Sequence, residues 1–105
     1  MAVKHLETAE FDAVMEASPL AMVDFWADWC GPCRMLAPVM EALAERYGEK
    51  VLIGKVNVDR EMELARRFGV MNIPTVVFLK NGREFDRKVG AYPAEVYAGV
   101  LNGAL

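Results

Sequence analysis

The chain has 105 residues, of which 54% are hydrophobic and 26% are charged. This composition is typical of a folded globular protein, and the length predicts one domain spanning residues 1–105. Lysine and arginine total 12 and aspartate and glutamate total 15, which gives a formal net charge of −3. A mildly acidic chain without basic runs is not expected to bind nucleic acid.

The distribution of apolar residues predicts a cytoplasmic protein. The first seven residues, MAVKHLE, lack the apolar stretch of a signal peptide. No apolar run reaches the ~18 residues needed to cross a bilayer, so no membrane partner is expected. The cytosol disfavours stable disulfides, and both cysteines lie in one tetrapeptide, Cys30 to Cys33. The pair therefore indicates catalysis, metal binding or redox exchange, and not a structural framework.

The first half of the chain predicts alternating strands and helices. A short strand over Val3–Leu6 precedes a helix over Ala9–Glu16, for which Thr8 is the expected N-cap. Leu20–Trp26 is almost continuously apolar, which is typical of a strand buried on both faces. The second helix is expected over Pro32–Tyr47, where apolar residues recur at helical spacing.

The second half predicts one more helix, a hairpin and a final helix. We expect a strand over Val51–Val58 and a charged helix over Arg60–Phe68. Two further strands are expected over Thr75–Lys80 and Glu84–Val89. Asn81-Gly82 indicates a hairpin turn because both residues tolerate positive φ, and the last helix begins near Pro93. Parallel strands with crossover helices, followed by an antiparallel edge, give an α/β fold: a five-stranded mixed β-sheet with helices on both faces.

The motif Trp29-Cys30-Gly31-Pro32-Cys33 lies between the buried strand and the second helix, where open α/β sheets place their functional sites. Two cysteines three residues apart on an opening helical turn lie on one face, within reach of a disulfide. Cys30 would lie at the helix N-terminus, where free N–H groups and the helix dipole favour a thiolate. The motif thus predicts a reversible dithiol, with Cys30 as the nucleophile and Cys33 as the resolving cysteine.

The segment from Val23 to Cys33, VDFWADWCGPC, resembles the active-site segment of the thioredoxin family nearly residue for residue. The resemblance continues at KVNVD (55–59), IPT (73–75), KNG (80–82) and VGA (89–91), and it covers essentially the whole chain. It implies the thioredoxin fold, a five-stranded mixed sheet flanked by four α-helices, and a protein-disulfide reductase activity. Tyr92-Pro93 departs from the family pattern, in which a polar helix cap is more usual at this place.

Two charged residues near the motif are further candidates. Asp24 lies in the apolar strand, where burial should raise its pKa. From the residues alone, a carboxyl held by backbone hydrogen bonds is the simpler interpretation. The resemblance implies instead that Asp24 accepts or relays the proton of Cys33 through water. From the residues alone, Lys55 is a lysine whose side chain reaches solvent. The resemblance places it near Asp24, where its charge would modulate the pKa values of Asp24 and the cysteines.

The resemblance also implies a docking surface for target proteins. Most X-Pro bonds are trans, so trans is expected for Ile73-Pro74 from the residues alone, whereas the family has a cis proline here. Ile73 would offer backbone hydrogen bonds to an extended target segment. The apolar docking collar implied by the resemblance consists of Trp29, Gly31, Pro32, Ile73, Pro74, Val89, Gly90 and Ala91.

The partners follow from the resemblance as well. Members of the family are recharged by thioredoxin reductase, a flavoprotein that draws on NADPH. The chain is therefore expected to be a monomeric electron carrier in cell redox homeostasis, with thioredoxin reductase and disulfide-containing proteins as its partners. It would need no metal and no cofactor apart from its own Cys30–Cys33 disulfide.

Other functions remain open at this stage. An oxidant or isomerase on the same fold usually carries histidine between its cysteines, whereas Gly31-Pro32 is the dipeptide of the family's reductants. The cysteines could also bind a metal, although structural zinc takes four ligands and the chain offers two cysteines and a distant His5. The domain could, finally, be a redox-inactive subunit of a larger complex.

Overall fold

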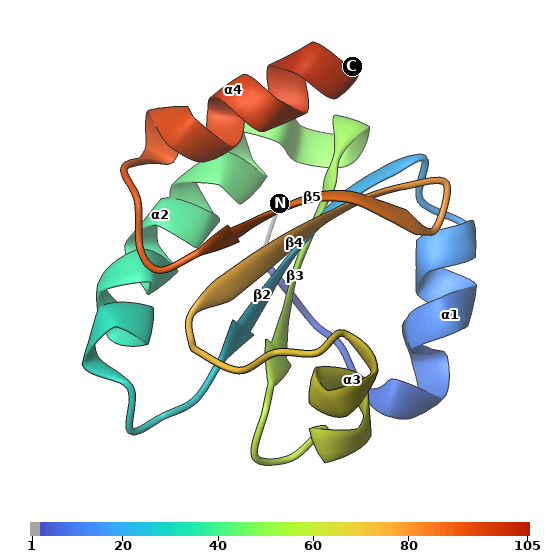
Figure 1. The fold of residues 1–105 in the computed structure, drawn as a ribbon. Helices are drawn as coiled ribbons and strands as arrows, with labels where there is room; N and C mark the ends of the chain where they lie inside the picture. The colour runs from blue at the N-terminus through green and yellow to red at the C-terminus, as the bar shows by residue number, and fades with distance from the viewer. Residues whose placement is uncertain (1–2) are drawn as a thin grey trace.

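A computed structural model describes residues 3–105 of the chain. These residues form a five-stranded sheet in the order β1-β3-β2-β4-β5 (Figure 1). The strands are β1 (Lys4–His5), β2 (Leu20–Trp26), β3 (Leu52–Asn57), β4 (Thr75–Lys80) and β5 (Arg83–Val89). β2 runs parallel to β3 and antiparallel to β4, so it lies at the centre of the sheet. The predicted mixed α/β sheet is confirmed.

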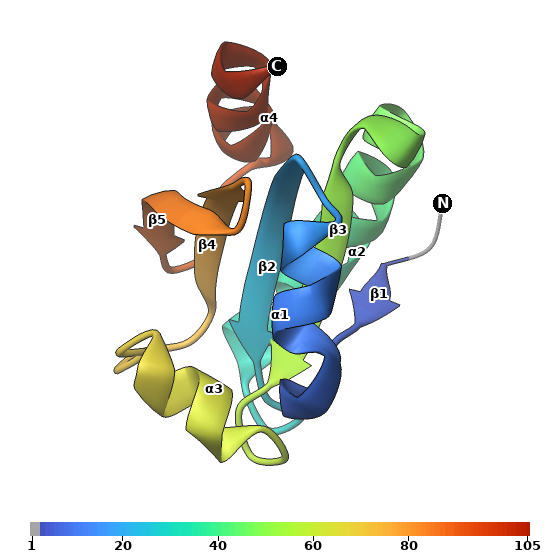
Figure 2. The same cartoon turned by 90° about the vertical axis from the view of Figure 1, so that its right-hand side faces the viewer.

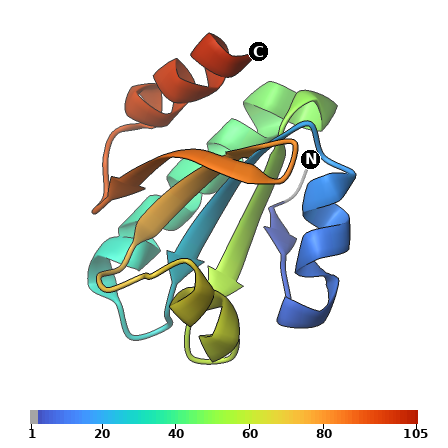
Figure 3. The same ribbon diagram turned by 45° about the vertical axis from the view of Figure 1, so that its right-hand side comes forward.

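Helices cover both faces of this sheet. Within the described residues they are α1 (Thr8–Glu16), α2 (Gly31–Tyr47), the short 3₁₀-helix η1 (Gly48–Lys50), α3 (Met62–Arg67) and α4 (Ala94–Ala104). α2 and α4 cover one face, and α1 and α3 cover the other (Figures 2 and 3). No helix within residues 3–105 is long and apolar enough to cross a membrane.

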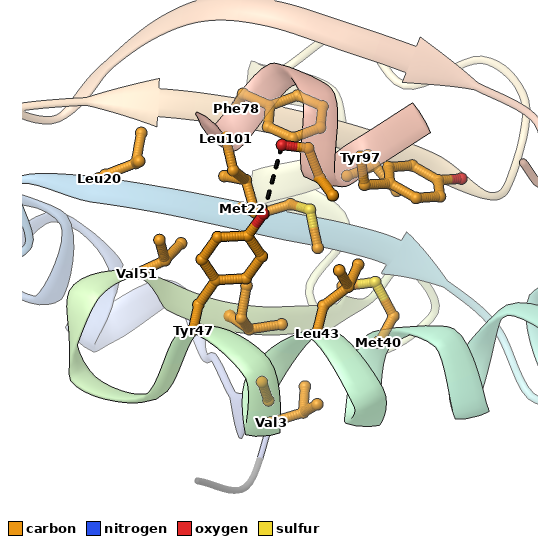
Figure 4. Close-up of a cluster of buried hydrophobic side chains, with 14 of the residues drawn as sticks. Val3, Leu20, Met22, Met40, Leu43, Tyr47, Val51, Phe78, Tyr97 and Leu101 are labelled. Atoms are coloured by element: carbon orange, nitrogen blue, oxygen red, sulfur yellow. Dashed lines mark hydrogen bonds between the residues drawn. The ribbon is translucent and has the colours of Figure 1, made fainter. Parts of the chain in front are cut away.

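The central strand β2 is buried because an apolar cluster lies on each of its faces. Met22 belongs to the cluster under α2 and α4, which also contains Tyr97 (Figure 4). Val23 and Phe25 belong to the cluster under α1 and α3. Side chains alternate along a strand, so Asp24 points to the same face as Met22, towards α2 and α4. The fold thus places one carboxyl group in an apolar layer.

The first helix begins differently from the prediction. α1 starts at Thr8 itself, and Glu7 occupies the N-cap position without a side-chain hydrogen bond. The backbone N–H and the hydroxyl of Thr8 both donate to Oε1 of Glu61, each at 2.8 Å. A carboxylate from a distant segment therefore satisfies the first free N–H of α1, whereas the sequence pattern assigned the capping of this helix to Thr8.

Other boundaries differ only slightly from the predictions. β1, β3 and α3 are shorter than the elements expected over Val3–Leu6, Val51–Val58 and Arg60–Phe68. The hairpin turn between β4 and β5 is confirmed, with φ of 52° at Asn81 and 82° at Gly82. These positive values are the backbone conformation that the dipeptide favours.

Candidate active site

The two cysteines lie where β2 leads into α2. Cys30 is the N-cap residue of α2, and it forms a disulfide with Cys33, with the Cα atoms 5.2 Å apart. The N–H of Cys33 points to Sγ of Cys30 at 3.2 Å. Cys30 is 5% exposed and Cys33 is 2% exposed, so Cys30 is the more accessible of the two. In the reduced protein, the donors of the helix N-terminus favour a thiolate on Cys30.

The segment that leads into β4 packs against the disulfide. The carbonyl oxygen of Ile73 lies 3.8 Å from Sγ of Cys30. Figures 1 and 3 show this segment beside the turn from β2 to α2, at the same end of the sheet. The Ile73–Pro74 peptide bond is cis. The trans form expected from the residues alone is therefore wrong, and the form implied by the family resemblance is confirmed.

Asp24 is a buried acid on the α2 side of β2. It is 1% exposed, and neither of its carboxyl oxygens has a hydrogen-bond partner among residues 3–105. The simpler interpretation, a carboxyl held by backbone hydrogen bonds, is therefore wrong. Burial raises the pKa of Asp24 from 3.8 to about 7, and the positive charge of Lys55 opposes part of this rise. The carboxyl group can thus bind and release a proton near neutral pH.

Lys55 is the register partner of Asp24 on the parallel strand β3. Its Nζ lies 4.1 Å from the centre of the Trp26 ring, which is a cation–π contact. Lys55 and Trp26 also line a surface pocket of about 230 Å³, to which His5 contributes. Both interpretations of Lys55 therefore hold. Its side chain reaches a pocket open to solvent, and its charge lowers the pKa of Asp24.

Trp29 is exposed beside the disulfide but is held in place. It is 67% exposed, and its Nε1 donates a hydrogen bond to Oδ2 of Asp59 at 2.8 Å. Asp59 follows β3, and its N–H donates to Oδ1 of Asn57 at 2.9 Å. No local sequence pattern indicates this role of Asp59, because the two residues are 30 positions apart in the chain.

The predicted docking collar comes from three loops, which the structure brings together around the disulfide. The N–H of Gly90 donates to the carbonyl of Pro74 at 2.8 Å and so joins the β5–α4 loop to the segment before β4. Pro74 was predicted to belong to the exposed collar, but it is buried and lies beneath the collar surface. The exposed members are Trp29, Pro32, Val89 and Ala91, and the half-buried ones are Gly31, Ile73 and Gly90.

The geometry defines a class of protein. A disulfide between two cysteines of one helical turn lies at the carboxyl end of the central strand, with an acid of raised pKa in the same strand. Within residues 3–105, no three His, Cys, Asp or Glu side chains are grouped so that they could hold a metal ion. These features, on a five-stranded mixed sheet covered by four α-helices, are those of a disulfide oxidoreductase with the thioredoxin fold.

Comparisons with known proteins lead to the same class. The thioredoxin family model matches residues 2–102. A thioredoxin of Staphylococcus aureus is 45% identical over 102 residues, which cover 97% of this chain and 97% of that protein. A thioredoxin of Alicyclobacillus acidocaldarius is 44% identical over 90 residues, or 86% of each chain. A solved structure of a mutant thioredoxin from Halobacterium salinarum matches with a TM-score of 0.91 and 32% identity. The match covers 98% of this chain and 90% of that protein's chain.

The chain belongs to the thioredoxin family. It has the thioredoxin fold, and it is a protein-disulfide oxidoreductase that acts by dithiol–disulfide exchange.

Proposed function

We propose that this protein reduces disulfide bonds in other proteins, with Cys30 as the nucleophile and Cys33 as the resolving cysteine. The observation that carries this proposal is the position of Cys30 as the N-cap of α2, with the N–H of Cys33 directed at its sulfur. A thiolate is the attacking form of cysteine, and a helix N-terminus favours it. Cys33 lies one turn further along the helix and is more buried, which supports the second role.

The cycle consists of two exchange steps. The Cys30 thiolate attacks one sulfur of a target disulfide, the target S–S bond breaks, and the other target sulfur leaves as a thiolate. Cys33 loses its proton and attacks Sγ of Cys30, and the mixed disulfide breaks to release the second target thiolate. The target gains two electrons and takes up two protons, and the protein ends with the Cys30–Cys33 disulfide.

Asp24 is proposed as the base that takes the proton of Cys33, through water. Its carboxyl group is buried on the α2 side of β2 without a hydrogen-bond partner among residues 3–105, and its pKa is raised to about 7. A base whose pKa lies near the working pH is present in the deprotonated form and still accepts a proton readily. Lys55, as the register partner of Asp24, tunes this acidity through its positive charge.

Target proteins are proposed to dock on the apolar collar around the disulfide. Trp29 supplies its largest exposed side chain, and Val89 at the end of β5 and Ala91 in the β5–α4 loop extend the surface. An extended target segment would pair with the backbone of Ile73, whose carbonyl lies next to Cys30. Gly31 leaves open space at its Cα, since an added Cβ would meet no atom within 4 Å. A target backbone can therefore approach the sulfur closely.

The proposed partners are thioredoxin reductase and disulfide-containing proteins of the cytoplasm. The reductase would return two electrons from NADPH to the Cys30–Cys33 disulfide, so that this chain acts as an electron carrier without a cofactor of its own. We further propose that residues 1–105 act as one monomeric domain. The net charge of −3 supports protein partners over nucleic acid.

The direct test is the reduction of insulin disulfides with NADPH and a thioredoxin reductase. We expect the wild-type protein to turn over and Cys30→Ser to be inactive. Cys33→Ser should accumulate a mixed disulfide with the target, because the second exchange step is then missing. Activity that survives in Cys30→Ser would contradict the proposed nucleophile.

The direction of the reaction needs a separate measurement, because an oxidant would use the same two steps in reverse. We expect a reduction potential close to the ≈ −270 mV typical of thioredoxins. A value near the ≈ −180 mV of protein disulfide isomerase would contradict the reductase assignment.

A further inference from the structure

Tyr97 is a polar side chain inside the apolar cluster under α2 and α4, and the proposed cycle does not use it. It is fully buried on α4, and its ring stacks on Phe78 with 6.4 Å between the ring centres. Tyr47 belongs to the same cluster, and its hydroxyl bonds to Ala98 and Asn102 of α4. Figure 4 shows the hydroxyl of Tyr97 well apart from that of Tyr47. The two tyrosines thus use their hydroxyls in different places.

The hydroxyl of Tyr97 bonds to the loop that joins β5 to α4. It accepts a hydrogen bond from the N–H of Tyr92 at 3.1 Å and donates one to the carbonyl of Gly90 at 3.3 Å. The N–H of Gly90 donates in turn to the carbonyl of Pro74 at 2.8 Å. The peptide groups around Gly90 are therefore held from α4 on one side and from the segment before β4 on the other.

Apart from these bonds and the edge contact of the Tyr92 ring with the Tyr97 ring, 6.3 Å between the ring centres, this loop has few means of keeping its shape. Gly90 has a φ of 100°, and an added Cβ there would meet only the edge of the Tyr92 ring, at 3.9 Å. Glycine adopts many conformations, so this position does not fix the chain by itself. Pro93 is the N-cap residue of α4, and no side chain caps the helix there. The hydroxyl of Tyr97 instead bonds to the peptide groups just before the helix, at Gly90 and Tyr92.

The same loop carries the exposed collar residue Ala91 and follows directly on Val89, the last residue of β5, and through Pro74 it is joined to Ile73 beside the reactive sulfur. We propose that Tyr97 is a positioning residue for substrate binding: its hydroxyl holds the β5–α4 loop in the conformation in which the collar receives a target protein. This inference rests on the proposed docking role of the collar. It assigns Tyr97 no contact with the target and no part in the exchange of electrons.

The test compares Tyr97→Phe with Tyr47→Phe. Each change removes one hydroxyl with two hydrogen bonds from the same cluster and keeps the ring, but only Tyr97 bonds to the loop. The apparent KM for insulin is measured with dithiothreitol as the reductant, and the reaction of each reduced protein with the small disulfide DTNB, which needs no docking, is measured beside it. Hydrogen exchange at the amide of Tyr92 reports directly whether the bond to the Tyr97 hydroxyl is lost.

We expect Tyr97→Phe to raise the KM for insulin about three- to ten-fold, with kcat and the DTNB rate within about two-fold of wild type. Exchange at Tyr92 should become faster in Tyr97→Phe alone. Tyr47→Phe should leave the KM unchanged even if it lowers stability equally. An unchanged KM in Tyr97→Phe, or an equal rise in both variants, overturns the inference and gives the hydroxyl a merely structural role.

A third variant separates this inference from the proposed function. Ala91→Asp places a charge on the exposed collar, and we expect it to raise the KM for insulin. If it raises the KM and Tyr97→Phe does not, only the positioning role of Tyr97 is wrong. If Ala91→Asp leaves the KM unchanged, this part of the docking collar itself is wrong, and the inference about Tyr97 is lost with it.

Discussion

Asp24 and Lys55 are register partners on β2 and β3, and their side chains lie on the same face of the sheet, yet they form no hydrogen bond. The ammonium of Lys55 lies over the Trp26 ring, beside a pocket open to solvent. Its charge therefore lowers the pKa of Asp24 only in part, and burial keeps that pKa at about 7. The arrangement keeps an acid in the core that changes its protonation in the range in which thiols react.

The raised pKa predicts that Asp24 destabilises the folded protein as the pH rises. Below pH 3.8 the carboxyl group is protonated in both the folded and the unfolded state, so its ionisation does not lower the free energy of unfolding. Above about pH 7 it is ionised in both states, and the free energy of unfolding is lowered by the full cost of burying the charge. Asp24→Asn should therefore stabilise the oxidised protein by an amount that grows between these limits. At about 1.4 kcal/mol per pKa unit, the gain reaches about 4 kcal/mol at pH 8.

Urea unfolding of oxidised wild type and Asp24→Asn between pH 4 and pH 8 measures this gain. Asp86→Asn serves as the control, because Asp86 is only half-buried and its Oδ1 accepts a hydrogen bond from the N–H of Arg87. A difference between Asp24→Asn and wild type that does not change with pH would show that Asp24 is not protonated in the folded protein at neutral pH.

The same substitution should slow the second exchange step. Without a carboxylate to take its proton, Cys33 attacks the mixed disulfide less readily, and we expect resolution to be about ten-fold slower or more at neutral pH. The deficit should shrink towards pH 9, where hydroxide can replace the base. Single-turnover reduction of a target disulfide, followed at several values between pH 6 and pH 9, measures the rate. Equal rates for both proteins over this range would contradict the base role.

Removing the charge of Lys55 should move the pKa of Asp24 further upwards. Lys55→Met keeps the chain length but removes the cation that opposes the effect of burial. The pH at which Asp24 titrates, followed by NMR of its carboxyl carbon, should rise, and the pH profile of resolution should shift in the same direction. Lys50→Met removes an exposed cation from η1 and should leave both unchanged. A downward shift in Lys55→Met would contradict the coupling between the two residues.

The sequence predicts best those parts of the fold that depend on neighbouring residues. The bounds of β2 were predicted without error, because a strand buried on both faces leaves an almost continuous apolar run, Leu20–Trp26, which only Asp24 interrupts. The hairpin turn follows from the backbone preferences of Asn81-Gly82 alone. The cysteine pair likewise needs only the first turn of one helix, so its disulfide could be predicted from spacing.

Contacts between distant segments are the part that the sequence pattern does not contain. Thr8 is a residue type that commonly caps helices, but its own N–H and hydroxyl are bound by Glu61 from the segment before α3. Tyr97 lies on the apolar face of the last helix. Its hydroxyl forms hydrogen bonds only because the fold brings the β5–α4 loop next to it. In both places the partner is set by the topology of the sheet, and no local pattern indicates it.

The hydrogen bond between Trp29 and Asp59 predicts a role in docking for Asp59, which no sequence motif indicates. Asp59→Ala removes the acceptor of the Trp29 Nε1–H, so the exposed indole ring is free to turn. We expect the KM for insulin to rise about two- to five-fold, in line with the loss of one hydrogen bond, with the DTNB rate unchanged. Glu63→Ala removes an exposed acid from α3 and should leave the KM unchanged. Equal KM values for Asp59→Ala and wild type would contradict this role.

Gly54 in β3 predicts a loss of stability that leaves catalysis intact. A Cβ at this position would lie 2.6 Å from Cδ1 of Leu6 and 3.2 Å from the carbonyl oxygen of Lys4. Leu6 is itself buried, and it lies beside the backbone of β1 that pairs with Gly54, so its side chain or β1 must shift away from β3. We expect Gly54→Ala to lower the free energy of unfolding by about 1–3 kcal/mol, the usual cost of overpacking. Gly99→Ala, in α4, meets no atom within 4 Å and should instead raise it by about 0.5–1 kcal/mol. Urea unfolding of the two variants measures these changes, and insulin reduction checks that activity is kept. If both alanines were tolerated alike, β1 would be a loosely held edge strand and not a strand packed closely on β3.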